Sequence, residues 1–210
     1  MQIAMVLFEH CTALDVVGPY EVLSRWPDAT LHFVGERKGL VRTDTEMLAL
    51  NVDTTYEEIP RPDIIMVPGG YGQRDHRDGS ALVDWLRAAD QHTTWTISAC
   101  TGSLILAAAG LLTGRHATTH WLAFDDLAAL GAIPTEDRVV FDGKYVTAAG
   151  VSAGIDMAIT LTSTALGEEM AQIVQLGLEY DPQPPFATGG PRTAPQFAVD
   201  AVTAERDNIV

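Results

Sequence analysis

TWTISACTGSLILAAA, residues 94–109, joins a short apolar segment to a helical one with almost no residues between them. The first part, Thr94–Ser98, is rich in β-branched residues and too short for most helices, which is typical of a buried parallel strand. The second part, Ser103–Ala109, has apolar spacings that predict a helix. Cys100 lies at the joint. A nucleophile on such a turn projects from the carboxyl edge of a sheet, where open α/β sheets bind their ligands.

Similar strand and helix patterns continue on both sides of this joint. Further buried strands are predicted at Gln2–Phe8, Leu31–Val34 and Asp63–Val67. Further helices are predicted at Pro19–Trp26, Ser80–Ala89 and Leu122–Leu130, the last closed by Gly131. Strands that alternate with helices predict an α/β fold, here a flavodoxin-like doubly wound sandwich with a mostly parallel central sheet.

The C-terminal third changes character along its length. Asp142-Gly143 predicts a β-hairpin with a type I′ turn. A long helix is predicted at Ala153–Leu166 and another from Glu168 towards Glu179, whereas Asp181–Pro195 holds too much proline and glycine for a helix or a central strand. We therefore expect one α/β domain over residues 1–180, and a Pro/Gly-rich arm with a short terminal segment of the same domain over residues 181–210.

The charge and composition of the chain argue against some classes of binding partner. The chain has 28 acidic and 13 basic residues, a formal charge of −15, so nucleic acid would be repelled. No apolar run reaches the ~20 residues that cross a bilayer, and no signal peptide precedes the first strand, so no membrane association is expected. The two cysteines, Cys11 and Cys100, cannot form a disulfide framework. A reducing, cytoplasmic location fits them better.

The setting of Cys100 allows two interpretations. A helix N-terminus supplies partial positive charge and free N–H groups, which can lower a cysteine pKa from ~8.5 to roughly 3.5–7.5 and produce a reactive thiolate. Free cysteines are also frequently small buried hydrophobes without chemistry. Spacing alone does not separate these two interpretations.

Several segments together resemble one family. Ala99-Cys-Thr-Gly-Ser103 and Ala117-Thr-Thr-His-Trp121 are similar to the isonitrile hydratase branch of the DJ-1/PfpI superfamily. So are, in the same order along the chain, Leu14–Leu23, Val67–Gly70, Gly150–Asp156 and Gln175–Phe186. The resemblance covers most of the chain. It implies a DJ-1/PfpI fold of the class I glutamine amidotransferase-like type, Cys100 as the nucleophile, and a homodimer.

The resemblance gives Asp15 a second possible role. Thr12-Ala-Leu-Asp15 matches a capping box, in which Asp15 would only cap the first helix. In the superfamily a carboxylate at this place points towards the cysteine sulfur, and the hydratase branch uses aspartate. The resemblance therefore implies that Asp15 is a general acid and base, a role that does not exclude capping.

Gly70, Thr101 and His120 complete the candidate site. By resemblance, the amides of Gly70 and Thr101 stabilise charge that develops on the substrate, although Gly69-Gly70 also suits an ordinary tight turn. Thr101 stands where protease-like relatives have histidine, and it either orders the site or caps the nucleophile helix. His120 is a second-shell candidate, or a histidine with only a structural hydrogen bond.

The predicted reaction is hydration of an isonitrile to an N-substituted formamide. Cys100 attacks the isonitrile carbon to give a thioimidate, while Asp15 supplies a proton and then activates water. The histidines and acids show no metal-ligand spacing, and Gly69-Gly-Tyr-Gly72 lacks the lysine of a nucleotide loop, so neither a metal nor another cofactor is expected. The alternatives are a non-catalytic redox-sensing or ligand-binding regulatory protein, and the amidase-like half of a transcription regulator.

Overall fold

A seven-stranded sheet forms the centre of the molecule, in a computed structural model that describes residues 1–77 and 79–210. Its order is β10-β11-β7-β6-β1-β2-β5, and only β10 runs antiparallel to its neighbour. The strands are β1 Gln2–Val6, β2 Thr30–Gly35, β5 Thr54–Thr55, β6 Ile64–Val67, β7 Trp95–Ala99, β10 Val139–Asp142 and β11 Tyr145–Ala148. The mostly parallel, doubly wound α/β sandwich predicted from the sequence is confirmed.

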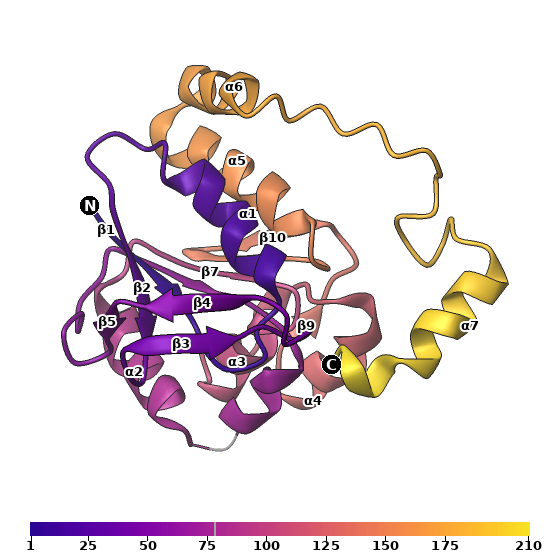
Figure 1. Cartoon of the computed structure of the whole chain (residues 1–210), viewed down its shortest axis with the longest axis horizontal. Helices are drawn as coiled ribbons and strands as arrows, with labels where there is room; N and C mark the ends of the chain where they lie inside the picture. Colours follow the sequence, from indigo (N-terminus) through magenta and orange to yellow (C-terminus); the bar gives the residue numbers. More distant parts are fainter. Residues whose placement is uncertain (78) are drawn as a thin grey trace.

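Helices cover both faces of this sheet (Figure 1). α1 packs against α5 on one face, and α2 packs against α3 on the other. The helices are α1 Ala13–Leu23, α2 Ala81–Ala89, α3 Gly102–Ala108, α4 Phe124–Ala129, α5 Ala153–Leu166, α6 Glu168–Gly177 and α7 Gln196–Ala204. Four 3₁₀ turns, η1 to η4, lie at Tyr71–His76, Asp90–His92, Trp121–Ala123 and Arg206–Asn208.

Two small sheets, which the sequence did not predict, lie outside the central one. β3 Gly39–Arg42 pairs with β4 Ala49–Val52 in antiparallel fashion, and β8 His116–Ala117 pairs with β9 Ile133–Pro134 in parallel.

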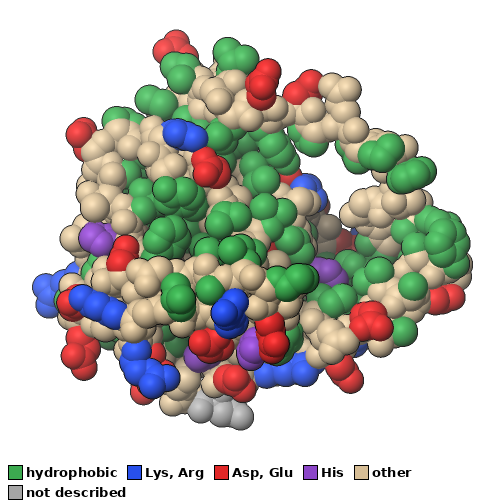
Figure 2. All heavy atoms as spheres, in the orientation of Figure 1, with side chains coloured by type: hydrophobic (Ala, Val, Ile, Leu, Met, Phe, Trp, Pro, Cys, Tyr) green, Lys and Arg blue, Asp and Glu red, His purple; other side chains and the backbone are tan. Residues whose placement is uncertain are grey.

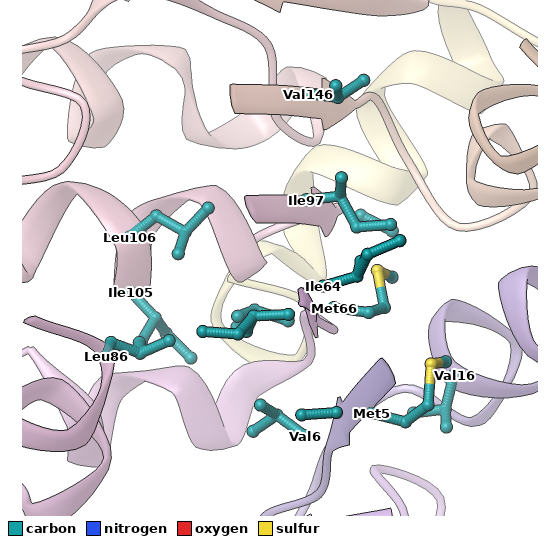
Figure 3. Packing of buried hydrophobic residues seen from close by; sticks show 14 of the residues in the cluster. Met5, Val6, Val16, Ile64, Met66, Leu86, Ile97, Ile105, Leu106 and Val146 are labelled. Carbon is teal, nitrogen blue, oxygen red and sulfur yellow. The ribbon is translucent and has the colours of Figure 1, made fainter. Parts of the chain in front are cut away.

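The hydrophobic core lies on both sides of the central strands. Residues Ile3 to Val6 of β1 and the whole of β6 are fully buried, as expected for parallel strands covered on two faces. Figure 3 shows Met5 beside Val16 of α1, whereas Val6 lies towards Leu86 of α2 and Ile105 of α3. Successive strand residues thus supply the two halves of the core, and this packing holds the carboxyl ends of β1, β6 and β7 together.

The first helix begins six residues earlier than predicted. The sequence suggested a start at Pro19, but α1 begins at Ala13 and carries Pro19 in its interior. The reason is tertiary packing: a Cβ atom on Gly154 of α5 would lie 3.0 Å from Pro19 Cγ, so the proline ring fills the space that this glycine leaves open. The contact between α1 and α5 therefore offsets the hydrogen bond that proline cannot make.

The hairpin between β10 and β11 is present, but its turn differs from the predicted one. Asp142 pairs with Tyr145, so the two-residue loop is Gly143-Lys144. Of these two residues only Gly143 has a positive φ, 63°. A type I′ turn needs positive φ at both positions, whereas a type II′ turn needs it only at the first, so the type I′ prediction is wrong.

Residues 181–195 contain no helix or strand and arch away from the rest of the molecule (Figure 1). α7 and η4 then bring the chain back to α4, where Val210 is buried. Among residues 1–77 and 79–210, no helix combines the length and the apolar composition that crossing a membrane requires.

Candidate active site

Cys100 lies on the sharp turn between the end of β7 at Ala99 and the start of α3 at Gly102. Its φ is +54°, a conformation that non-glycine residues rarely adopt. Its amide donates to two carbonyl oxygens at the end of β11, at 3.0 and 3.1 Å. Its carbonyl accepts from the hydroxyls of Ser103 and Thr119 at 3.2 and 3.1 Å. These bonds hold Cys100 in its strained conformation, which is frequent at functional sites.

Two glycines let the surrounding backbone approach this turn. A Cβ atom on Gly102 would lie 2.2 Å from the carbonyl oxygen of Val67, so α3 can start against the end of β6 only with glycine there. A Cβ atom on Gly69 would lie 2.5 Å from the Thr101 amide nitrogen and 2.9 Å from Cys100 Cβ. The loop after β6 therefore lies directly against Cys100.

Asp15 is fully buried and faces the same loop from α1. Its Oδ2 atom accepts a hydrogen bond from the Gly69 amide at 2.9 Å, whereas its Oδ1 atom is buried without a hydrogen-bond partner among the described residues. The Thr12 side chain makes no capping bond and instead donates to Asp44 at 2.8 Å, while the Thr12 amide donates to the Gly69 carbonyl. The capping-box interpretation is therefore wrong, because both of its side chains have other partners.

The pKa values of this pair are both raised. Burial raises the pKa of Asp15 to about 8, although the Gly69 amide and the Cys100 thiol lower it in part. Burial, and next the charge of Asp15, raise the pKa of Cys100 well above its usual value. The opposing contributions come from the amides of Thr101 and Val151 and from the Thr101 hydroxyl.

Burial and Asp15 act against the interpretation of Cys100 as a thiolate that the helix N-terminus stabilises, because both raise its pKa. Cys100 is only 1% exposed, so a thiolate there loses its hydration, and the negative charge of Asp15 adds to that cost. The start of the seven-residue helix α3 does not offset these two effects. The resting site is a protonated thiol beside a carboxyl group that titrates near neutral pH.

Thr101 connects this pair to the glycine loop. The Gly70 amide donates to Thr101 Oγ1 at 3.0 Å, so the amide is already occupied by the chain itself. The Thr101 hydroxyl makes no capping bond to α3, and both it and the Thr101 amide reach the Cys100 sulfur. The Gly70 amide is therefore bonded to the Thr101 hydroxyl and is not a free donor.

Residues 1–164 match the model of the family described as DJ-1/PfpI. The chain belongs to the DJ-1/PfpI family. Over 201 residues it is 47% identical to the isonitrile hydratase of Pseudomonas putida, and the match covers 95% of this chain and 87% of that protein. The crystal structure of a ThiJ/PfpI family protein from Pseudomonas syringae has a TM-score of 0.93 and 33% identity, covering 99% of this chain and 88% of that one.

A transcription regulator is also among the relatives of this DJ-1/PfpI chain. The HTH-type transcriptional regulator CdhR of Pseudomonas aeruginosa is 35% identical over 128 residues. That match covers 59% of this chain but only 37% of the regulator. The similarity therefore concerns one part of a longer protein.

His120 is placed differently from the other candidates of this DJ-1/PfpI site. Its Nδ1 atom accepts from the Leu122 amide at 3.3 Å, and burial lowers the pKa of His120 to about 4, so the ring is neutral at pH 7. The ring packs against Gly150, where a Cβ atom would lie 2.8 Å from its Cδ2. It is Thr119, one residue earlier, that contacts Cys100. These contacts favour the interpretation that His120 makes only a structural hydrogen bond and has no part in the chemistry.

Two functional positions were missed by the sequence analysis of this DJ-1/PfpI chain. Thr119 bonds the Cys100 carbonyl, and the Val151 amide reaches the Cys100 sulfur. Both lie in the motifs around TTHW and GVSAG, but a backbone amide leaves no signal in the side-chain sequence. In the described parts of the chain, no group of three or more His, Cys, Asp and Glu side chains could hold a metal ion.

Proposed function

We propose that this protein hydrates isonitriles, R–NC, to N-substituted formamides, with Cys100 as nucleophile and Asp15 as general acid and base. The observation that carries the proposal is that Asp15 and Cys100 are both buried against Gly69: its amide donates to Asp15 Oδ2 at 2.9 Å, and a Cβ atom on it would lie 2.9 Å from Cys100 Cβ. The 47% identity to an isonitrile hydratase over 95% of the chain supports the substrate class.

In the first step, the Cys100 sulfur forms a bond to the terminal carbon of the isonitrile. The carboxylate form of Asp15 accepts the thiol proton and passes it to this same carbon, which holds the electron pair left by the addition. The product is a thioimidate, R–N=CH–S–Cys100, and Asp15 is again a carboxylate. An Asp15 pKa of about 8 suits this role, because the group can both hold and release a proton near neutral pH.

In the second step, Asp15 takes a proton from water as the water oxygen bonds to the thioimidate carbon. That proton moves to the nitrogen and gives the adduct R–NH–CH(OH)–S–Cys100. The C–S bond then breaks, the hydroxyl proton returns through Asp15 to the sulfur, and the formamide R–NH–CHO leaves. Water, the substrate and these two side chains supply every proton and electron pair, so the proposal includes no cofactor.

Thr101 and Val151 stabilise the sulfur in both steps. Negative charge develops on Cys100 as its proton departs and again when the C–S bond breaks. The two backbone amides and the Thr101 hydroxyl that reach the sulfur are fixed donors for that charge. Gly70 contributes through its hydrogen bond to Thr101, which positions the hydroxyl. His120 takes part in no step and packs against Gly150.

The main alternative function is that of a redox sensor or a ligand-binding regulator. Sulfenic-acid sensors depend on an accessible thiolate of low pKa. Here the thiol is buried and its pKa is raised, which favours chemistry in which a nearby base activates the thiol after the substrate binds.

We further propose that the protein acts as a homodimer in the cytoplasm. Homodimers are common in this superfamily, and large apolar side chains of α6, the arm and α7 are strongly exposed: Ile173, Leu176, Phe186 and Phe197. Figure 2 shows hydrophobic side chains on the outer part of the arm and α7. Both cysteines are free thiols, which a reducing compartment maintains.

Product analysis tests the proposed reaction directly. The protein, dialysed against a chelator, is mixed with cyclohexyl isonitrile, and the formyl proton of the product is followed by NMR. We expect stoichiometric N-cyclohexylformamide, and in quenched samples a mass increase on the Cys100 peptide equal to one isonitrile. Absence of formamide, or its dependence on an added divalent ion, would contradict the proposal.

A further inference from the structure

A cavity of about 750 Å³ lies next to the buried Cys100–Asp15 pair. Its inner wall includes Val151, whose amide reaches the Cys100 sulfur, and Thr119, whose hydroxyl bonds the Cys100 carbonyl. It also includes Leu14, which precedes Asp15 in α1. Only the residues of this wall lie between the cavity and the side chains of Cys100 and Asp15. The volume of the cavity is in the range that holds drug-sized ligands.

The outer wall of this cavity comes from the C-terminal arm. Residues 189–193 line it, opposite Trp121 and Phe124. The far end of the arm is anchored to the same region, because the Arg206 guanidinium donates to the Leu122 carbonyl at 3.2 Å and pairs with Asp126. Figure 2 shows the arm standing away from the body and enclosing an opening. The chain that follows the arm is thus bonded to η3 and α4, next to the cavity.

The lining of the cavity combines apolar side chains with the neutral polar side chains of Thr119, Ser152 and Thr193, and its charged side chains are paired. Arg192 of the arm forms an ion pair with Glu136, and Arg138 forms one with Asp156. The His120 ring is neutral at pH 7, since its pKa is lowered to about 4. The apolar lining consists of Leu14, Trp121, Phe124, Ala149, Val151 and Pro191. A ligand that fits these surroundings is bulky, apolar and without net charge.

We propose that this cavity holds the R group of the isonitrile and that arm residues 189–193 determine which R groups are accepted. The inference rests on the proposed function and names its substrate class: isonitriles with a large, uncharged aromatic or branched aliphatic R group. The slender NC group reaches Cys100 past Val151 and Thr119, while the R group stays against Trp121, Phe124 and the arm.

Gly190→Trp tests the role of the arm by filling the cavity from its outer wall. Gly190 lines the cavity, a Cβ atom there meets nothing within 4 Å, and its φ lies outside the range that strains other residues. Gly177→Trp is the matched control, because Gly177 has the same open surroundings on the exposed side of α6 and does not line this cavity. Trp121→Ala changes the opposite wall and serves as a second variant.

The measurement is kcat/KM for methyl isonitrile and for 2-naphthyl isonitrile. The wild type is expected to prefer the naphthyl substrate at least about 10-fold, because apolar area is buried only with that R group. Gly190→Trp should lose this preference at least about 10-fold, the scale on which pockets discriminate by size, because its indole ring takes the space of the R group. Trp121→Ala should weaken the preference, and Gly177→Trp should keep it.

An unchanged ratio in both Gly190→Trp and Trp121→Ala, with both isonitriles converted, would overturn this inference and leave the proposed function standing. If the wild type converts neither isonitrile, the proposed function itself fails. Calorimetric binding of N-(2-naphthyl)formamide gives a readout that does not depend on turnover. Binding by wild type and Gly177→Trp, and at least about 10-fold weaker binding by Gly190→Trp, is expected; equal binding by all three contradicts the inference.

Discussion

At the scale of single residues, the site depends on the burial of two titratable side chains, those of Asp15 and Cys100. Asp15 and Cys100 come from segments 85 positions apart in the chain; the charge of Asp15 raises the pKa of Cys100, whereas Cys100 lowers the pKa of Asp15 in part. The sequence supplied both residues through motif resemblance. The sequence could not predict whether the Cys100 pKa is raised or lowered. That shift depends on burial by the Gly69 loop and on the charge of Asp15, and neither is a local property of the CTGS motif.

Asp15→Asn separates chemistry from structure at this position. The amide keeps the size of the side chain and an oxygen that can accept from Gly69, so the fold should persist. Asparagine cannot shuttle the proton, so kcat should fall by about 10² to 10⁴, the usual contribution of a general acid or base. Above pH 8, where Asp15 is a carboxylate, alkylation of Cys100 by iodoacetamide should be faster in the variant, because the charge that raises the Cys100 pKa is gone. Near-normal kcat would show that Asp15 is no acid or base.

The same residue should make stability depend on pH. The folded pKa of Asp15, about 8, is raised above its ordinary value of 3.8, so between these values the folded chain holds a proton that the unfolded chain has lost. The free energy of unfolding should therefore fall as pH rises from 4 to 8 through this group. Asp15→Asn should make the profile flatter in urea titrations from pH 5 to 9. Identical slopes for both proteins would contradict a buried, protonated Asp15.

At the scale of elements, the predicted pattern was most accurate where strands are buried on both faces. β1, β6 and β7, which are buried along most of their length, lie within two residues of their predicted ends. The ends of β2 were also predicted to within two residues, although only its last two residues are buried. α1 was displaced because its start depends on the packing of Pro19 against Gly154. β3 and β4 were missed because their side chains are largely half-buried or exposed and leave a weak hydrophobic pattern.

Gly102→Ala tests the close contact between β6 and α3. The added Cβ would lie 2.2 Å from the Val67 carbonyl oxygen, so the start of α3 and the adjoining Cys100 must shift. We expect a loss of stability of about 1–3 kcal/mol, the usual cost of overpacking, together with reduced turnover. Gly177→Ala in α6 is the matched control and should be neutral or slightly stabilising in thermal unfolding. Equal melting temperatures for the two variants would argue against the contact.

At the scale of the whole molecule, the net charge and the exposed apolar side chains have opposite effects on the association of two copies of the chain. A formal charge of −15 disfavours contact between copies, yet α6, the arm and α7 expose apolar side chains. The course of the arm away from the body was not predictable, because residues 181–195 carry signals against helix and strand but none for direction. Its return through Arg206 to Leu122 and Asp126 is a long-range contact without any local pattern.

The homodimer proposal predicts a solution mass of twice the chain mass of 22.6 kDa. Sedimentation equilibrium at micromolar concentration should give that value, and raised salt should strengthen the association by screening the like charges. Phe197→Glu and Leu176→Glu place charge on the exposed apolar side chains and should shift the equilibrium towards monomer. A monomer at all concentrations and salt levels would contradict the proposal.

If Cys100 forms the bond to the isonitrile carbon, Cys100→Ala should be unable to produce formamide at an appreciable rate. Cys11→Ala is the matched control, since it removes the other buried thiol of the chain. Both proteins should be folded by circular dichroism. We predict that Cys100→Ala loses at least about 10³-fold in kcat, as expected when a covalent nucleophile is removed, whereas Cys11→Ala stays within a few-fold of wild type. Formamide production at the wild-type rate by Cys100→Ala would contradict the account.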